Sequence, residues 1–448
     1  MLKPVRVGLC GLGTVGSGTF NVLMRNAEAI GRRVGRPIVV EHVGARRDHP
    51  ECDLSQTRVS RDIFDVARDP DVDVVVELIG GNTVARELVL EAIAHGKHVV
   101  TANKALLAEQ GEDIFRAAAE KGVIVAFEAA VAGGIPIIKA IRESLAANRI
   151  QWLTGIINGT GNFILTHMLE EGRQFDDVLA EAQTLGYAEA DPTFDVDGID
   201  AAHKLTLLAS VAYGIPLQFD RVYTEGLSHL TQDDIEQAAG LGYVIKHLGI
   251  ARRSAKGIEL RVHPTLVPKS QLLANVNGVE NAIEVMGDAL GPTLYCGPGA
   301  GAEPTASAVI ADIVDVARDM HLPAEYRTPY LGFNAISESG EHLPVLSVDD
   351  IQSAYYLRLV ARDRSGVLAR ITAILAEQNI SIESMVQCEH RGDDRHVNII
   401  LLTHVAQEAC MNAAIRQLET LDDIECPITR IRVEHFDDQQ AGLNTATH

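Results

Sequence analysis

The feature that most constrains this chain is a glycine-rich turn close to its start. The turn follows an apolar, β-branched run at Val5–Cys10 and precedes a stretch of helical periodicity at Val15–Ala29. It has the pattern G-x-G-x-x-G and consists of Gly11, Leu12, Gly13, Thr14, Val15 and Gly16. In this pattern the glycines permit a tight turn, close approach of a pyrophosphate, and close packing of helix on strand, while amides at the helix start face the phosphate. The turn therefore predicts a dinucleotide-binding domain, and its position between strand and helix disfavours a plain glycine turn.

The rest of the N-terminal region alternates short β-branched runs with helical stretches. The predicted strands are Val5–Cys10, Ile38–Gly44, Val72–Ile79, His98–Thr101 and Val123–Phe127. The predicted helices are Val15–Ala29, Thr83–His95 and Lys104–Glu120. The strands are apolar almost throughout, as expected of a parallel sheet that is covered on both faces. This order of elements predicts a doubly wound, Rossmann-type α/β domain.

The end of the second predicted strand bears on which dinucleotide is bound. An acidic residue there usually binds the ribose 2′-hydroxyl of NAD. In this sequence the strand is followed by Arg46 and Arg47, whose guanidinium groups favour the extra phosphate of NADP. Glu41 and Asp48 lie close by in the sequence and leave NAD as the alternative.

Chain length and charge restrict the class of function. A chain of 448 residues suffices for two to four domains at roughly 100–200 residues each. With 39 Lys and Arg against 61 Asp and Glu, the formal net charge is −22. This acidic excess disfavours binding to nucleic acid or to an anionic membrane surface. We expect an enzyme that acts on a small molecule.

The sequence predicts neither a membrane helix nor a secreted protein. The least polar stretch, Val123–Ile138, is shorter than a bilayer span and contains Glu128 and Pro136. The N-terminus leads into the glycine-rich turn without the features of a signal peptide. Six cysteines are scattered without a Cys-x-x-Cys pair, which predicts free thiols. We expect a cytoplasmic protein.

After residue 133 the predicted elements become mixed. A helix is expected at Ile135–Ala147, a strand at Ile150–Ile157, a polar loop at Asn158–Asn162 and an acidic loop at Gly186–Asp197. The later predicted strands and helix of this α+β region are Tyr243–Ala251, Gly257–Val267, Ala282–Met286 and Pro304–Met320. Residues 323–350 have the proline and glycine content of a linker.

The C-terminal part of the chain has the order βαββαβ. Its predicted strands are Tyr355–Ala361, Ile380–Gln387, Val397–Thr403 and Ile428–Val433. Ser365 is expected to cap the first helix, which carries an apolar stripe, and Val405–Leu418 forms the second.

Two lysines are candidates for chemistry. Lys104 follows the predicted strand His98–Thr101, at the edge of the sheet where ligands bind, although a solvated lysine is the alternative. Asp200 and Lys204 are spaced i, i+4 and share one helix face. An exposed pair of this kind would contribute only about 0.3–0.5 kcal/mol. The apolar run after Lys204 instead predicts a buried helix, on which a lysine needs a function.

Taken together, these motifs resemble homoserine dehydrogenase. The resemblance extends to about residue 330. Besides the glycine-rich turn, it rests on Thr101–Lys104, Glu128–Pro136, Asn158–Asn162, Gly186–Lys204 and Gly297–Ser307. The C-terminal region, with Arg364–Leu368 opening its first helix, is similar to an ACT domain, the amino-acid-sensing module. This pairing implies the longer, monofunctional form of the enzyme.

The resemblance assigns a role to each predicted domain. We expect a dinucleotide-binding domain at 1–133, a catalytic, substrate-binding and oligomerisation domain at 134–322, and a linker at 323–350. An ACT regulatory domain at 351–436 and a disordered tail at 437–448 complete the chain. The fold class is therefore α/β, with three structured domains.

The reaction implied by the resemblance is the reversible reduction of L-aspartate 4-semialdehyde to L-homoserine by NAD(P)H, on the route to threonine and methionine. Lys204 is implied as the general acid in reduction and the base in oxidation, with Asp200 orienting it and binding substrate. Glu189 is implied to bind the α-ammonium group of the substrate. Lys104 is implied to lie between nicotinamide and substrate, so the division of proton transfer between the two lysines stays open.

The resemblance also implies further ligands and partners. A sodium ion is implied at Glu128, Val131, Gly133 and Ile135. Gly301 is implied in a second loop on the cofactor side, with Glu303 near the start of the following helix. We expect a homodimer or homotetramer, and inhibition by L-threonine bound between the Asp363–Gly366 turn and a partner ACT strand.

Two other functions compete with this interpretation. A semialdehyde dehydrogenase that forms an acyl phosphate would need an activated cysteine. Cys296 is the candidate in the middle region, and the sequence offers it no evident histidine partner. A nucleotide- and amino-acid-sensing regulator without catalysis is the second alternative, and the presence of Lys104, Lys204 and Glu189 argues against it.

Overall fold

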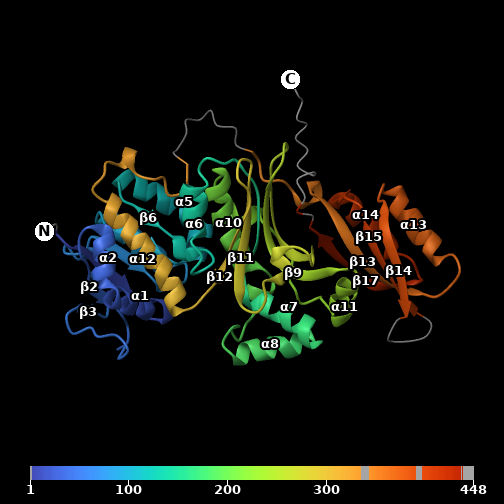
Figure 1. The fold of residues 1–448 in the computed structure, drawn as a ribbon, viewed down its shortest axis with the longest axis horizontal. Helices are drawn as coiled ribbons and strands as arrows, with labels where there is room; N and C mark the ends of the chain where they lie inside the picture. Colours follow the sequence, from blue (N-terminus) through green and yellow to red (C-terminus); the bar gives the residue numbers. More distant parts are fainter. Residues whose placement is uncertain (1–2, 334–342, 390–395, 435, 437–448) are drawn as a thin grey trace, which may run out of the picture. The chain divides into compact units, whose positions relative to one another are not determined.

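The computed structural model describes residues 3–333, 343–389, 396–434 and 436 of the chain (Figure 1). It divides into two compact units, each built from three segments of the chain. The first unit comprises 1–159, 199–222 and 279–342, and the second comprises 160–198, 223–278 and 343–448. Part of the expected linker and the expected disordered tail at 437–448 lie outside the described residues.

The first unit is built on a six-stranded parallel sheet in the order β3-β2-β1-β4-β5-β6. This is the predicted Rossmann-type arrangement, in which the strand order reverses beside β1. Its strands are β1 (Val5–Cys10), β2 (Ile38–Gly44), β3 (Arg58–Ser60), β4 (Val74–Glu77), β5 (His98–Thr101) and β6 (Val125–Ala126). The strand β3 is not predicted from the sequence, because its three residues are mostly exposed and show no apolar run.

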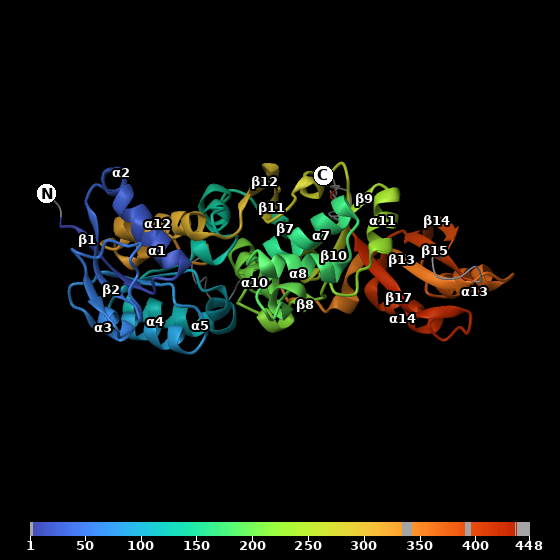
Figure 2. The same ribbon diagram turned by 90° about the horizontal axis from the view of Figure 1, so that it is seen from below.

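Helices cover both faces of this sheet, as Figure 2 shows. One face carries α1 (Thr14–Arg25), α2 (Ala27–Val34) and α12 (Ala302–Asp319). The other carries α3 (Ile63–Arg68), α4 (Val84–Ala94) and α5 (Lys104–Lys121). Phe20, Val309 and Ile313 join one apolar core with the valines of β1 and β4. A helix far along the sequence thus completes the N-terminal domain.

Two predicted helices of the first unit are interrupted. The expected helix at Val15–Ala29 breaks at Asn26, where α1 gives way to α2. The expected helix at Ile135–Ala147 is a short α6 (Ile137–Lys139) followed by a π-helical turn at Ala140–Ser144. The amide of Leu145 bonds the carbonyl of Ala140 at 2.9 Å, five residues back, which widens this turn.

The first unit also contains three antiparallel strands and a buried helix. The strands lie in the order β12 (Gly291–Pro298), β11 (Glu280–Gly287) and β7 (Ile150–Ile156). The helix α10 (Ile199–Tyr213) is buried from Asp200 to Ala212. The expectation of a buried helix around Lys204 is therefore confirmed.

The second unit contains a mixed sheet in the order β9-β10-β17-β13-β15-β14. These strands are β9 (Tyr243–Arg253), β10 (Ile258–Pro268), β17 (Ile424–Val433), β13 (Gln352–Arg362), β15 (His396–Thr403) and β14 (Ile382–Glu389). The short strands β8 (Tyr223–Thr224) and β16 (Ala406–Gln407) pair with β10 and β13. The βαββαβ order of the C-terminal region is confirmed, and its sheet continues into β10 through a parallel pairing of Thr265 with Arg432.

Helices of the second unit cover both sides of the C-terminal sheet. On one side α13 (Val367–Glu377) and α14 (Glu408–Leu418) pack on Tyr355 and Leu357. The alternate residues Ala354 and Tyr356 join a second core with helices of the middle region. Those helices are α7 (Gly159–Glu171), α8 (Phe175–Thr184) and α11 (Gln232–Gly240), and a short α9 spans Thr193–Val196.

Two local expectations, at the start of α7 and at the start of α13, are wrong. The polar stretch predicted as a loop at Asn158–Asn162 begins α7 at Gly159, because Thr160 to Asn162 are buried and packing overrides their weak helix propensity. Ser365 does not cap α13. The residue before that helix is Gly366, in the left-handed region at φ 91°, and it makes no side-chain bond to the helix.

All six cysteines are free, as expected. Among the residues that the structure describes, no helix is long and apolar enough to cross a membrane.

The packing of α1 on α12 gives a stability prediction. A Cβ atom at Gly18 would lie 2.6 Å from the carbonyl oxygen of Ala302, so Gly18→Ala forces the two helices apart. We expect the substitution to lower the free energy of unfolding by about 1–3 kcal/mol in urea titrations. The matched control is Gly31→Ala in α2, where the nearest atom would be 3.5 Å away. Helix propensity alone should make this control more stable by up to about 1 kcal/mol. Stabilisation by both substitutions would contradict the close packing.

Candidate active site

The glycine-rich turn has the geometry that a bound pyrophosphate requires. Gly11 lies in the left-handed region at φ 97°, and a Cβ there would meet the carbonyl oxygen of Leu78 at 2.7 Å. A Cβ at Gly16 would lie 2.0 Å from the carbonyl oxygen of Gly11. At Gly13, the residue before α1, nothing lies within 4 Å of an added Cβ, so the helix start is open to a ligand. These residues fit a dinucleotide phosphate.

The residues after β2 add positive charge at the same edge of the sheet. Arg46 and Arg47 follow β2 after one intervening residue, Ala45, and are exposed. The two nearby acids are engaged elsewhere, because Glu41 pairs with Arg6 at 3.9 Å and Asp48 bonds the guanidinium of Arg61.

The carboxyl edge of the sheet continues at β4 and β5 with a set of polar bonds. Glu77, fully buried at the end of β4, accepts hydrogen bonds from the Thr101 hydroxyl at 2.6 Å and from the amide of Ile79 at 2.9 Å. Asn103 caps α5 by accepting a bond from the amide of Leu106 at 3.2 Å. Lys104 is the first residue of α5, so these bonds fix the position from which its side chain extends.

The two candidate lysines meet at one buried carboxylate. The Lys204 ammonium donates to Asp200 Oδ2 and to the carbonyl oxygen of Ile157, both at 2.6 Å. The Lys104 ammonium lies 3.1 Å from Asp200 Oδ1. Side-chain exposure is 6% for Asp200, 11% for Lys204 and 32% for Lys104. The carboxylate therefore bridges two cations, one deep in the protein and one at its surface.

Asp200 is ionised in this setting. Burial by itself would raise its pKa, but the charges of Lys204 and Lys104 and the hydrogen bonds to Asp200 outweigh burial. The pKa of the carboxyl is consequently held well below its usual range. The cluster therefore places the negative charge of Asp200 between the ammonium groups of Lys204 and Lys104.

Two positioning contacts were not found from the sequence. Asn158, directly after β7, donates from its amide to Asp200 Oδ2 at 2.9 Å. His203 Nε2 lies 3.0 Å from Glu109 Oε1, which ties α10 to α5. The sequence offered a signal for Asn158, since it is a polar residue at the end of an apolar strand.

The predicted cation ligands lie in one buried turn. Ala132 and Gly133 both adopt φ 52°, and a Cβ at Gly133 would meet the carbonyl oxygen of Gly299 at 2.3 Å. Both carboxylate oxygens of Glu128 accept backbone amides, from Ile138 at 2.9 Å and Lys139 at 2.8 Å. Burial raises the pKa of Glu128 to about 7. A carboxylate oxygen can accept a second contact, and carboxylate and carbonyl oxygens are the hard ligands that suit a cation such as sodium.

The remaining predicted residues belong to other elements of the chain. Gly301 precedes α12 with φ 124°, and Glu303 in the first turn pairs with Arg25 at 2.7 Å on the surface. Glu189 belongs to the second unit, where it is exposed and its carbonyl oxygen accepts a bond from Gln183 at 3.1 Å. Cys296 is exposed on β12, and desolvation raises the pKa of its thiol, which disfavours the thiolate that an acyl-transfer nucleophile needs.

A Rossmann-type sheet with an open glycine turn and a buried carboxylate between two lysines defines a dinucleotide-dependent oxidoreductase. Matches to known protein families narrow this class to one family of oxidoreductases. Residues 11–128 match the model described as homoserine dehydrogenase, NAD binding domain, and 136–314 match the model of homoserine dehydrogenase. Residues 355–423 match the ACT domain.

Individual relatives agree over almost the full length. The homoserine dehydrogenase of Pseudomonas aeruginosa is 63% identical over 97% of this chain and 100% of its own. That of Neisseria gonorrhoeae is 52% identical over 98% of this chain and 100% of its own. The crystal structure of a homoserine dehydrogenase from Thiobacillus denitrificans has a TM-score of 0.92 and 58% identity, covering 97% of this chain and 99% of that chain. The chain belongs to the homoserine dehydrogenase family.

The geometry at Asp200 predicts the effect of removing its charge. Asp200→Asn leaves two ammonium groups without their shared counter-charge, so we expect kcat to fall by about 10²–10⁴-fold. Steady-state kinetics would measure the loss, with circular dichroism to verify folding. Glu112→Gln, an exposed acid-to-amide change on α5, is the control and should keep normal rates. A kcat for Asp200→Asn within threefold of the unmodified enzyme would show that the bridging carboxylate is dispensable.

Proposed function

We propose that the enzyme interconverts L-aspartate 4-semialdehyde and L-homoserine, with the buried Asp200–Lys204 pair at the reacting carbonyl. The observation that carries this proposal is an ammonium held at 2.6 Å by a carboxylate one helical turn earlier, in the same unit as a glycine turn that fits a dinucleotide. The family of the chain supports the same reaction. A bound nicotinamide supplies the hydride.

The proposed work of Lys204 is proton transfer. In reduction the aldehyde oxygen becomes an alkoxide, and the Lys204 ammonium is the buried donor from which it takes a proton. In oxidation the neutral amine accepts the proton of the homoserine hydroxyl. The bonds to Asp200 and to the Ile157 carbonyl hold the amine in one orientation. Lys104, on the other oxygen of Asp200, is a second candidate for the same proton.

Substrate recognition is proposed to depend on pairing of the charged groups of the substrate with carboxylates of the enzyme. Homoserine carries an α-ammonium group, for which Glu189 is the proposed partner, and Asp200 is proposed to contribute to binding. Glu189 is exposed, which leaves its carboxylate open to a ligand.

NADP is the proposed cofactor, with NAD as an alternative. The glycine-rich turn, Lys104 and the loop at Gly301 are the proposed contacts. Arg46 and Arg47 are exposed after β2, while Glu41 and Asp48 are paired with other arginines, which favours a 2′-phosphate over a free 2′-hydroxyl. A hyperthermophilic archaeal homoserine dehydrogenase, 25% identical with a TM-score of 0.59, has been solved in complex with NADPH.

The wider setting is also proposed from the family and the domains. The reaction would serve threonine and methionine biosynthesis in the cytoplasm, in a homodimer or homotetramer. Residues 1–133 would bind the dinucleotide, 134–322 the substrate and the partner subunit, and 351–436 would form the regulatory domain after the 323–350 linker. Inhibition by L-threonine through the ACT domain is supported by the match of residues 355–423.

A spectrophotometric assay with homoserine and NADP tests the proposed reaction. We expect reduction of NADP by the unmodified enzyme and a loss of at least about 10³-fold in Lys204→Ala, because the buried proton donor is removed. Cys296→Ser should react at the normal rate, which separates this chemistry from acyl transfer. Normal turnover by Lys204→Ala, or the absence of turnover by the folded enzyme with both NADP and NAD, would refute the proposal.

A sodium ion at the Glu128 turn is proposed to stabilise the fold. The carbonyls of Val131, Gly133 and Ile135 and the acid Glu128 would hold it, with Asp312 as a second buried acid whose carboxylate accepts the Glu128 amide at 2.8 Å. Replacing tetramethylammonium chloride by sodium chloride at equal ionic strength should raise the melting temperature. Each kcal/mol by which bound sodium stabilises the folded state should add about 2–4 °C. Glu128→Gln should lose this increment and Glu112→Gln should keep it. Equal melting temperatures in the two salts would contradict the site.

A further inference from the structure

The loop that follows β4, here residues 78–82, lies directly beside the glycine-rich turn. A Cβ at Gly11 would lie 3.1 Å from Cγ2 of Ile79 in this loop. Gly80 and Gly81 continue the loop with φ of 70° and 76°, in the left-handed region that favours glycine. The β4 loop therefore borders the edge of the sheet where a dinucleotide phosphate fits.

Two side chains tie the β4 loop to α5. Asn103, the residue before that helix, donates from its side-chain amide to the Gly81 carbonyl oxygen at 2.7 Å. Glu109, in the second turn of α5, accepts a hydrogen bond on Oε2 from the side-chain amide of Asn82 at 2.7 Å. The loop is thus held to α5 at two points, which flank Lys104 in the sequence.

The other oxygen of Glu109 contacts the helix that carries Asp200 and Lys204. Glu109 Oε1 lies 3.0 Å from His203 Nε2. His203 is 1% exposed, and its ring packs on Phe219 with the ring centroids 4.3 Å apart. A carboxylate accepts and does not donate, so the imidazole carries a proton on Nε2 in this bond. One carboxylate therefore bridges the β4 loop and α10, with a separate oxygen for each.

The His203 ring is neutral in this bridge. Burial lowers the pKa of His203, and the nearby charge of Glu109 offsets this only in part. Since the ordinary pKa of histidine is about 6.5, a ring whose pKa is lowered is uncharged at neutral pH. The bridge therefore holds α10 in place without adding a third cation beside the two lysine ammonium groups.

We propose that Glu109 is a positioning residue for the reaction, because its two bonds fix the catalytic helix relative to the dinucleotide edge of the sheet. The proposal rests on the proposed role of Lys204 in proton transfer. His203 directly precedes Lys204 on α10, so a shift of the helix at His203 moves the Lys204 ammonium. Lys104 also links α5 to α10 through Asp200, and a second link limits rotation of one helix about the first.

Steady-state kinetics of homoserine oxidation by the full-length enzyme tests this role. Glu109→Ala removes both acceptor oxygens, and we expect kcat to fall by about 10–10²-fold, the cost of a small misplacement of reacting groups. The Glu109 side chain is 34% exposed, so the variant should fold normally. The KM of homoserine and the Kd of NADPH, measured by fluorescence titration, should change by less than about threefold, because the groups proposed to bind both ligands stay in place.

Glu109→Gln is the conservative variant that should restore the rate. Its amide oxygen can accept the bond from Asn82, and its amide nitrogen can donate to Nε2 of the other neutral tautomer of His203. We expect a kcat within about threefold of the unmodified value. Equal losses in Glu109→Gln and Glu109→Ala would assign the effect to the charge of Glu109 and overturn the bridging role.

A double-mutant cycle tests whether Glu109 acts through His203. His203→Leu removes the donor and keeps an apolar side chain against Phe219. If the two residues act as one bridge, the kcat losses of Glu109→Ala and His203→Leu should not multiply in the double variant. Urea unfolding of the same four proteins is a readout that does not depend on activity, and it should show non-additive changes in the free energy of unfolding. Losses that multiply, or additive changes in unfolding free energy, would overturn the proposal.

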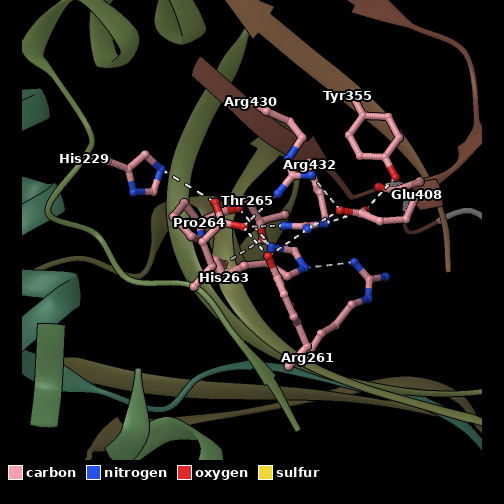
Figure 3. Close-up of polar contacts among 12 residues, drawn as sticks. His229, Arg261, His263, Pro264, Thr265, Tyr355, Glu408, Arg430 and Arg432 are labelled. Carbon is pink, nitrogen blue, oxygen red and sulfur yellow. Dashed lines mark hydrogen bonds and ion pairs between the residues drawn. The ribbon is translucent and has the colours of Figure 1, made fainter. Parts of the chain in front are cut away.

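Two controls separate positioning from a general loss of stability. Glu112→Ala makes the same change at an exposed acid of α5 and should keep the unmodified kinetics. In the second unit, the Tyr355 hydroxyl donates to Glu408 Oε2 at 2.7 Å, within the buried network of Arg430 and Arg432 that Figure 3 shows. Tyr355→Phe should lower the melting temperature because it breaks this bond, and should leave kcat unchanged. A fall of kcat in either control as large as that in Glu109→Ala would overturn the proposal.

The unmodified enzyme distinguishes failure of this role from failure of the proposed reaction. Absence of homoserine turnover by the unmodified enzyme would refute the reaction itself. Turnover by the unmodified enzyme together with a normal kcat in Glu109→Ala would refute the positioning role alone.

Discussion

The candidate site depends on a carboxylate at position 200 that is buried with two ammonium groups on its oxygens. An isolated buried charge is costly, and Asp200 is tolerated because Lys204, Lys104 and the Asn158 amide satisfy it. The same contacts fix the positions of the two lysine ammonium groups. Since Lys204 also bonds the Ile157 carbonyl, its ammonium has a defined position at the end of β7. Pairing at this one acid both stabilises the buried helix and orients the proposed proton donor.

Three parts of the first unit bring these groups together. The end of β7 supplies the Ile157 carbonyl and Asn158, the first turn of α10 supplies Asp200 and Lys204, and the start of α5 supplies Lys104. The last of these follows the carboxyl end of β5 in the parallel sheet, where ligands bind in doubly wound folds. The buried Glu77–Thr101 bond and the Asn103 cap hold that edge in place.

Much of this arrangement could be predicted from the sequence, because the decisive signals are local. The glycine turn, the apolar strands and the i, i+4 spacing of Asp200 and Lys204 each fix short-range geometry. The contact between Lys104 and Asp200 joins residues far apart in the chain. The residues alone predict Lys104 at the ligand-binding edge of the sheet and Asp200 on a buried helix, and nothing local brings the two together. The sequence predicts Asn158 as part of a polar loop, whereas in the structure it directly precedes α7 and bonds Asp200. The break at Asn26, the π-helical turn at Ala140–Ser144 and the return of α12 to the N-terminal sheet depend on packing that no local pattern encodes.

We propose that the Lys204 ammonium, held by Asp200, faces the oxygen that changes between aldehyde and alcohol. A crystal structure of the enzyme with NADP and homoserine tests this most directly. We expect the Lys204 nitrogen within about 2.6–3.2 Å of the homoserine hydroxyl oxygen, with the bond to Asp200 retained. A homoserine hydroxyl bound elsewhere, with Lys204 bonded to protein groups alone, would contradict it.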